Sequence, residues 1–378
     1  MVKKIKQWIS LLLLAGVFTF SLTSAILPSS PAPTEKNEQT HSLPAEEQTS
    51  KETGHHFDAE EMIMGHVLDS YEWHLLTIKG KHISIPLPVI LYSKEKGLNI
   101  FLSSKFHHGH SSYKGFRIAE EGKYAGKIVE ETADGQVVRP IDLSLTKTAV
   151  ALVFSVILLI WIFTSIARRY EKHRNEPPHG LQNLLEPLII FIRDEVAKAS
   201  IGEEKYEKYL PYLLTLFFFI FINNLLGLIP IFPAGANVTG NIAIPTVMAL
   251  FTFALVVVSA TKYFWIDIFN TPGVPWWLKF PFPLIPLIEF SSLFIKHIVL
   301  VIRLFANIVA GHIVALGFFA LIFIFGEMNT LAGYGISVVT IAFTVFLTLL
   351  ELLVAFIQAY VFTLLSALYI GLALEEGH

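Results

Sequence analysis

The sequence predicts an all-α polytopic membrane protein with five mature transmembrane helices, of which the last two are long and strongly tilted. A small extracytoplasmic α+β domain is predicted before them. The 378 residues are 53% hydrophobic and only 16% charged, whereas soluble domains are typically about 25% charged. The mean hydropathy is +0.57. The apolar residues are concentrated in runs long enough to span a bilayer, which indicates several membrane helices.

The composition and the missing motifs exclude several classes of function. The net charge of -3 gives no basis for binding nucleic acid. The absence of cysteine excludes thiol nucleophiles, disulfides and iron–sulfur ligation. The sequence holds no P-loop, no HExxH, no GxSxG and no glycine-rich dinucleotide motif. We therefore predict no cofactor and no covalent catalysis on this chain.

Two segments are predicted to precede the folded part. Residues 1–25 combine three lysines, a short apolar core and the small residues Thr23-Ser24-Ala25, which is typical of a secretory signal peptide; an uncleaved anchor helix is the alternative. Residues 26–56 are rich in Pro, Glu, Thr, Ser and Gln and are predicted to form a disordered linker. In either case, the segment that follows is exported.

Residues 57–140 are predicted to form the extracytoplasmic domain. KHISIPLPVILY and LNIFLSS have the character of short strands, and EEMIMGHVLDSYEWHLL is typical of a helix or of the start of a strand. The cluster His107-His108-Gly109-His110 could bind a metal. An exposed polar loop is favoured, because no further ligand has the spacing of a metal site.

Residues 141–378 are predicted to form the membrane domain. Its first span, about Ala149 to Ile166, is followed by the basic segment Ala167–Arg174, which indicates a cytoplasmic flank. Residues 181–200 are apolar on one side and charged on the other, so an amphipathic helix on the cytoplasmic membrane surface is favoured over a plain soluble helix. The second span is about Tyr209 to Ile229, and the third about Ile244 to Thr261.

Asn223 and Asn224 lie near the outer end of the second span, where membrane asparagines can serve interhelical packing or function; both readings stay open. Two long apolar segments follow, about Leu284 to Phe325 and Gly335 to Ala373, with an external turn at Gly326–Thr330. About 40 helical residues would reach about 60 Å, twice the bilayer core. We therefore expect both helices to be tilted or bent.

Arg303 is the central candidate residue, because an arginine at mid-membrane costs roughly 2.5–3.5 kcal/mol on insertion scales. At roughly 100° per residue, Asn307 lies one turn on, Lys296 two turns back and Glu289 four turns back, all near the Arg303 face. This polar stripe inside an apolar helix is typical of an ion or proton path.

The last helix carries Glu351 and Gln358, seven residues apart and so nearly on one face. An intramembrane carboxyl group is a functional candidate, with a structural ion pair as the alternative. His312, nine residues after Arg303, could simply bond to a neighbour; it follows Ala310-Gly311, which would let another helix approach.

The segment EFSSLFIKHIVLVIRLFANIVAGH, Glu289–His312, resembles the signature of subunit a of the F-type ATP synthase, and the resemblance extends from about residue 140 to the C-terminus. Ala306 replaces the usual glycine and His297 the frequent proline, but Arg303 and Asn307 match. Family subunits often place Glu and His where this chain has His312 and Glu351, in the reverse assignment.

The resemblance implies a stator subunit whose two half-channels pass protons to and from the carboxylates of a rotating c-ring. The implied proton-translocating residues are Arg303, Asn307, His312, Glu351, Gln358 and Glu289. The implied partners are the c-ring, the subunit b stalk and, through them, the soluble catalytic head. The implied location is the bacterial plasma (inner) membrane, with the N-terminus extracytoplasmic and the C-terminus cytoplasmic.

Two other functions are weighed against this interpretation. A secondary ion transporter would usually show an internal repeat with broken helices in both halves, and we find no such pair. A membrane scaffold would use the polar stripe only to pack its partners, and proton flux in vesicles would separate it from the stator.

Overall fold

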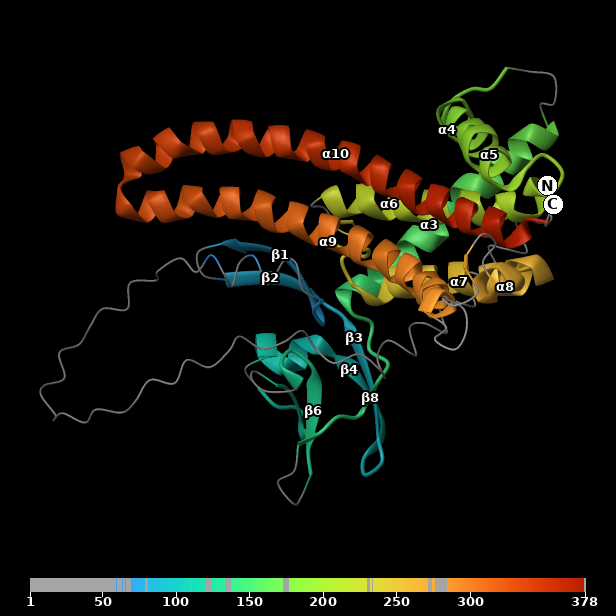
Figure 1. Cartoon of the computed structure of the whole chain (residues 1–378). Coiled ribbons are helices and arrows are strands. Elements are labelled where there is room, and N and C mark those ends of the chain that lie inside the picture. Colours follow the sequence, from blue (N-terminus) through green and yellow to red (C-terminus); the bar gives the residue numbers. More distant parts are fainter. Residues whose placement is uncertain are drawn as a thin grey trace, which may run out of the picture.

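The structure is a computed structural model that describes residues 69–78, 81–109, 111–119, 124–132, 137–172, 177–229, 234–270 and 284–376, together with a few isolated positions. Helices form an elongated bundle, and the strands form a separate body on one side of it (Figure 1). The predicted signal peptide, 1–25, and the predicted linker, 26–56, lie outside the described residues.

The N-terminal domain, predicted to be extracytoplasmic, is built from short antiparallel strands. A hairpin pairs β1 (Glu72–Ile78) with β2 (Lys81–Pro86). One three-stranded sheet has the order β4-β3-β8 and another the order β5-β6-β7. The bounds are β3 (Pro88–Ser93), β4 (Gly97–Leu102), β5 (Phe116–Ile118), β6 (Ile128–Glu131), β7 (Val137–Val138) and β8 (Ile141–Asp142).

The predicted strands are confirmed at KHISIP, PVILY and LNIFL. In EEMIMGHVLDSYEWHLL the predicted start of a strand is confirmed, because Glu72 to Leu76 belong to strand β1, while the described residues Ile63 and Gly65 before it are helical. A 3-10 helix, Ser103–Gly109, contains His107, and no group of three possible metal ligands occurs among the described residues. His110 lies outside them.

The domain core is aromatic and aliphatic. Val89 and Leu91 point inward from β3, because alternate residues of a strand face the same side. They pack with three fully buried residues of the second sheet and its surroundings: Phe106, Phe116 and Ile128.

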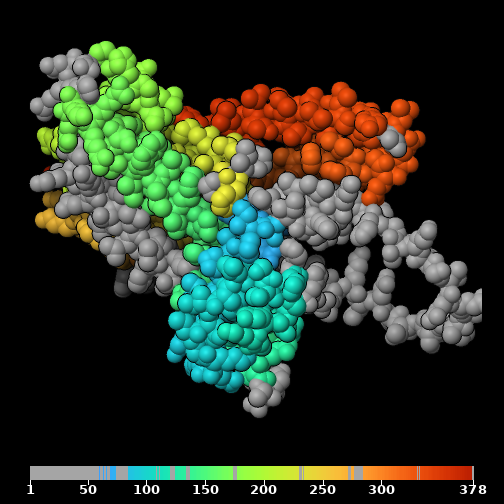
Figure 2. All heavy atoms as spheres, turned by 180° about the vertical axis from the view of Figure 1, so that it is seen from behind, coloured from blue at the N-terminus to red at the C-terminus, as the bar shows by residue number. Residues whose placement is uncertain are grey.

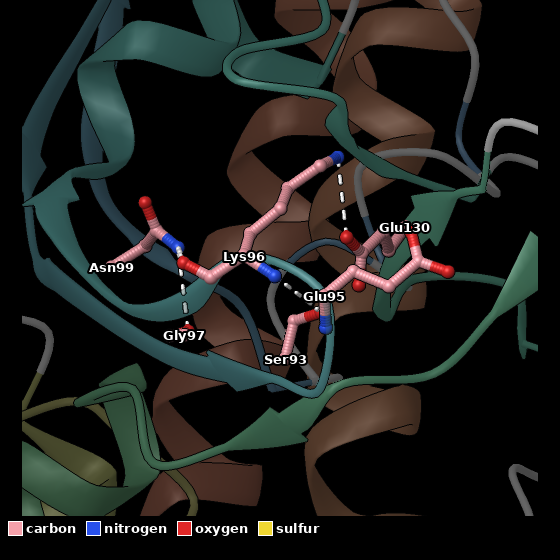
Figure 3. Close-up of polar contacts among 6 residues, drawn as sticks. All are labelled: Ser93, Glu95, Lys96, Gly97, Asn99 and Glu130. Atoms are coloured by element: carbon pink, nitrogen blue, oxygen red, sulfur yellow. Dashed lines mark hydrogen bonds and ion pairs between the residues drawn. The ribbon is translucent and has the colours of Figure 1, made fainter.

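The β3–β4 turn is held by side-chain hydrogen bonds (Figure 3). Ser93 Oγ accepts from the backbone N–H of Glu95 at 3.2 Å, and Asn99 Nδ2 donates to the carbonyl of Lys96 at 3.1 Å. Lys96 Nζ then reaches Glu130 of β6 at 3.2 Å. This ion pair ties the turn of one sheet to the other sheet.

The bundle opens with α3 (Lys147–Lys172), which continues beyond the predicted first span at both ends. The predicted amphipathic segment forms α4 (Leu181–Phe191), a π-helical stretch (Ile192–Lys198) and the short α5 (Ala199–Ile201). Ile192, Val196 and Ala197 are fully buried in the bundle core. The apolar side of this segment therefore packs on protein, and its position at a membrane surface stays a prediction.

Helix α6 (Tyr206–Leu228) matches the second predicted span, and α7 (Ala243–Ser259) the third. After α7 the chain turns by 102° into α8 (Lys262–Phe269), where Thr261 accepts the capping bond from Phe264 N–H. By length and composition, four helices of the described residues could cross a membrane, or five if α7 and α8 count as one span. The number of five spans thus stays a prediction.

The two long helices are α9 (Leu284–Met328) and α10 (Thr330–Leu374), of 45 residues each. They run side by side as a curved antiparallel hairpin that extends beyond the rest of the bundle (Figure 1). The predicted turn at Gly326–Thr330 is shorter than expected, because α9 runs to Met328 and Asn329 already caps α10 by accepting from Leu331 N–H.

Small residues line the inner seam of α10. Side chains of this size let helix backbones approach closely in a membrane, where hydrophobicity alone does not draw helices together. The fully or almost fully buried members are Ala355, Ala359, Thr363, Ser366, Ala367 and Ala373.

Candidate functional site

Arg303 lies on the open side of α9. The buried side of this helix is set by residues at three- and four-residue spacing, namely Leu293, His297, Leu300 and Leu304, which pack toward the bundle. Arg303 therefore faces outward and is exposed in this chain.

The predicted stripe shares that outer face. Lys296 and Asn307 are exposed and Glu289 is half-buried. The stripe is thus not enclosed by this chain. Within the described residues no hydrogen bond or ion pair engages the Arg303 guanidinium, although Tyr369 of α10 is close enough to interact with it electrostatically. The described part of the chain thus provides no carboxylate partner for this guanidinium.

His312 and Glu351 meet across the two long helices. Nδ1 of His312 lies 3.3 Å from Oε1 of Glu351, and both side chains are less than one fifth exposed. The separation of nine residues from Arg303 to His312 corresponds to about 13.5 Å along the helix. The structure therefore brings together the two titratable groups that the sequence analysis singled out.

Gly311 makes this contact possible. A Cβ at this position would overlap the Glu351 carboxylate oxygen and lie 3.2 Å from Cδ and 3.3 Å from Cγ of the same side chain. The glycine is helical, so its role is to leave room. The Glu351 carboxyl group rests directly on the α9 backbone, beside His312.

The C-terminal end of α6 forms a third wall of the site. Asn224 is buried; its Oδ1 accepts from the Thr239 hydroxyl at 2.7 Å and its Nδ2 points to the Ala355 carbonyl at 3.4 Å. Ala355 is one turn after Glu351 on α10. Asn224 thus makes the interhelical contact that the packing interpretation requires, while any role in function stays a prediction.

A second glycine brings α6 close to the histidine. A Cβ on Gly227 would lie 3.7 Å from Nε2 of His312 and 3.9 Å from the carbonyl oxygen of Ala236. The neighbouring Asn223 is different, because its amide donates to Phe219 of its own helix and its Oδ1 is buried with no partner among the described residues.

Gln358 is buried, unlike Arg303. No contact between the two side chains is found within the described part of the chain. The antiparallel register between the pairs His312/Glu351 and His297/Tyr369 puts Gln358 about one helical turn from the level of Arg303. Arg303 and Gln358, predicted to be neighbours, therefore lie at similar levels of the two long helices but do not touch.

Three members of this site were missed by the sequence analysis: Gly227, Ala236 and Thr239. Thr239 is fully buried although it lies between helices. No local pattern distinguishes such a threonine from one in an exposed loop. Of the three, only Gly227 could be suspected from the sequence, since a glycine in a membrane helix lets another helix approach closely.

The arrangement can carry protons. An imidazole and a carboxyl group in contact can exchange a proton, and a permanent cation nearby favours an anionic partner. No cluster of three metal-ligating residues accompanies them in the described ranges.

Comparisons with known proteins identify the family of the chain. The family described as ATP synthase A chain matches residues 149–371, and a family described as a domain of unknown function matches residues 62–145. ATP synthase subunit a of Chloroherpeton thalassium is 42% identical over 245 residues, covering 63% of this chain and 69% of the relative. The protein of the same name from Pelodictyon phaeoclathratiforme is 46% identical, covering 63% and 68%. That of Myxococcus xanthus is 39% identical, covering 63% and 75%. The chain belongs to the ATP synthase subunit a family and is a membrane protein.

Proposed function

We propose that this chain is the proton-translocating stator subunit of an F-type ATP synthase. It forms two half-channels that pass protons to and from the carboxylates of a c-ring, and so couples the proton gradient to rotation and ATP synthesis. The observation that carries the proposal is Arg303, a cation on the outer face of α9 that no other described helix covers. The family membership supports the same assignment.

Arg303 separates the two half-channels. Its guanidinium stays protonated under all physiological conditions, so it can pair with a c-ring carboxylate only while that carboxylate is ionised. A proton cannot hop through a group that neither gives up nor takes one. The arginine therefore draws the unprotonated carboxylate past the stator and blocks a direct leak. Gln358 is buried about one turn from the level of the arginine and is the polar group of α10 that would orient it.

The outer half-channel ends at His312 and Glu351. Their 3.3 Å contact allows a proton to pass between imidazole and carboxylate before it reaches the c-ring. Asn307 lies between this pair and Arg303 on α9 and is exposed toward the same open face. The pair thus supplies protons, and the arginine receives the emptied site.

The inner half-channel runs toward Glu289. This residue lies near the start of α9 and is half-buried on the Arg303 side. Lys296 lies between Glu289 and Arg303 and points over the ring of Tyr369, with 6.0 Å from Nζ to the ring centroid. The two cations Lys296 and Arg303 repel the released proton, and the acidic Glu289 attracts it away from the arginine.

The partners and the orientation follow from this role. The c-ring lies against the open face of α9 and α10, and the subunit b stalk connects the chain to the soluble catalytic head. The C-terminus is cytoplasmic and the strand domain extracytoplasmic in the bacterial plasma membrane. The basic residues Arg168, Arg169 and Lys172 at the end of α3 support this orientation.

Substitution of Arg303 tests the proposal. Arg303→Ala should abolish ATP-driven proton pumping while the complex still assembles, because nothing then attracts the ionised carboxylate. Arg303→Lys should also nearly fail, since a lysine out of water can lose its proton and lacks the planar fork. The measurement is acidification of inverted vesicles that contain the whole complex, with assembly followed by co-purification. Normal pumping by the alanine variant would refute the mechanism.

A second test concerns the pair His312 and Glu351. Each single alanine variant should slow proton passage, and the exchanged variant, His312→Glu with Glu351→His, should recover part of the rate because the same two groups are again in contact. In a double-mutant cycle the coupling should exceed about 0.5 kcal/mol, the scatter of independent sites. Additive losses without recovery would show that the two residues do not act together.

A further inference from the structure

The strand domain touches the membrane domain through Trp73. This side chain is only 4% exposed although it lies at the edge of the domain. It packs with Ala151 of α3 and with Ala236 and Val238 of the loop that follows α6. Its ring also stands edge-on to Phe232, with the centroids 5.0 Å apart. Figure 2 shows the blue part of the domain against the yellow segment of this loop.

The domain is also fastened to the start of α3. The carboxylate of Asp69 accepts a hydrogen bond from Thr148 N–H at 3.0 Å, and the carbonyl of Ser70 accepts one from Lys147 N–H at 2.9 Å. The first of these satisfies a free N–H group at the helix N-terminus, as a cap does. Trp73 comes only four residues after Asp69, so its position relative to α3 is well determined.

On its other side, the loop reaches the candidate proton path. We name the segment 234–239 the outer loop. Its Gly235 N–H donates to the Leu226 carbonyl at 2.9 Å, and its Thr239 hydroxyl donates to Asn224 Oδ1 at 2.7 Å. Gly227 stands between the carbonyl of Ala236 and Nε2 of His312. The outer loop is thus a thin layer between Trp73 and the His312–Glu351 pair.

We propose that the strand domain is part of the proton-translocating machinery, with Trp73 as a positioning residue that holds the outer loop against the outer half-channel. This inference rests on the proposed function. Pressure of Trp73 on Ala236 and Val238 keeps Thr239 within reach of Asn224. The Thr239 bond fixes which end of the Asn224 amide faces Ala355 of α10, one turn from Glu351.

The physical reason is that Trp73 packs on the two buried apolar side chains of the outer loop, whereas the loop's links to α6 are hydrogen bonds. Ala236 and Val238 are small side chains, and both are 2% exposed because Trp73 covers them. A truncated side chain at position 73 would leave a cavity, and a cavity next to a polar path admits water or allows the loop to shift. Either result changes the surroundings of His312.

The experiment uses the whole complex in liposomes, in which the pH on each side of the membrane is set separately. Trp73→Ala should reduce proton-driven ATP synthesis by about 2- to 30-fold, the range observed for residues that act on a site through intermediate residues. It should also shift the dependence of the rate on extracytoplasmic pH and leave the dependence on cytoplasmic pH unchanged. Trp73→Phe, which keeps an aromatic ring in place, should restore most of the rate.

Two further variants control the interpretation. Thr239→Val keeps the side-chain shape and removes the hydroxyl, so it should produce the same shift without altering the domain. Adding Trp73→Ala to it should lower the rate less than twofold more, because neighbours in one network are not additive. Trp161→Ala removes an exposed tryptophan from α3 and should leave both rate and profile unchanged.

The outcomes separate the inference from the proposed function. An unchanged rate and profile in Trp73→Ala or Thr239→Val would overturn the inference, as would a loss in proportion to the amount of assembled complex without any pH shift. Arg303→Ala is measured in parallel. If it abolishes coupling while Trp73→Ala and Thr239→Val behave as the wild type, only the inference fails; if it couples normally, the proposed function fails.

Discussion

Gly311→Ala is the sharpest perturbation of the candidate site, because it adds one methyl group at the contact between the long helices. The added Cβ would overlap Oε1 of Glu351 and lie 3.2 Å from its Cδ. The carboxyl group is the far end of a flexible side chain, so it can rotate away while the helices stay in place. The change should therefore separate Glu351 from His312 and leave the fold intact.

The magnitude follows from two opposing effects. Overpacking in a close-packed interior costs about 1–3 kcal/mol, whereas alanine favours a helix over glycine by up to about 1 kcal/mol. The stability of the subunit should therefore change little. When the Glu351 carboxyl group moves away, it loses its contact with His312. Such a hydrogen bond is worth about 1–3 kcal/mol, so the rate of proton transfer should drop by about 5- to 150-fold.

Gly317→Ala is the matched control, because it makes the same change on the same helix with no atom within 4 Å of the new Cβ. ATP-driven acidification of vesicles should be near the wild-type rate in Gly317→Ala and strongly reduced in Gly311→Ala at equal assembly. Adding Glu351→Asp to Gly311→Ala withdraws the carboxyl group by about 1.5 Å and should restore part of the rate. Equal rates in the two alanine variants would refute the reasoning.

Two predictions concern the C-terminal end of α10. Gly371→Ala would push a methyl group into the Ser200 carbonyl, a backbone group that cannot rotate away. The Tm of the detergent-solubilised complex should therefore fall. Gly335→Ala is the control, because the space around this glycine is open and the Tm should not fall. The hydrogen bond from Lys205, 2.6 Å from Glu376, lowers the pKa of that carboxyl group; this contribution to stability is present above the ordinary carboxyl pKa and lost as the pH falls through the lowered one. Lys205→Met should therefore lower the Tm slightly at pH 7. The difference in Tm from the wild type should vanish at acidic pH and shrink in high salt. A difference in Tm that does not depend on pH would exclude this ion pair as its cause.

The element pattern was predictable because hydrophobic length is a strong signal. Runs of about 20 apolar residues require helices in a bilayer, and runs twice as long require long helices. The third span shows where the signal weakens: α7 has only 17 residues and the chain bends by 102° at Ala260-Thr261. Thr261 is an ordinary residue in the sequence, and its capping bond depends on the conformation that the bend creates.

The direction in which Arg303 faces was not predictable from periodicity. In a soluble helix the polar side faces water, whereas α9 is apolar almost all round, since lipid and neighbouring helices both accept apolar side chains. The stripe of Glu289, Lys296, Arg303 and Asn307 could be identified, but not whether this chain encloses it. Packing of Leu300 and Leu304 against the bundle decides the question and turns the arginine outward.

The pairing of His312 with Glu351 could be stated only as a condition, because it depends on the register of two 45-residue helices. A shift of the hairpin by one turn would move the carboxyl group by about 5.4 Å and break the contact. The register is set far from the pair, where Asn329 closes the turn and Gly326 lies directly against Gly333. Because a single residue connects the two helices, they cannot slide along each other. Gly326, Gly333 and Asn329, at the far end of the hairpin, therefore help to determine the geometry of the site. Their role could not be predicted from the sequence, because it depends on how the two helices pack on each other.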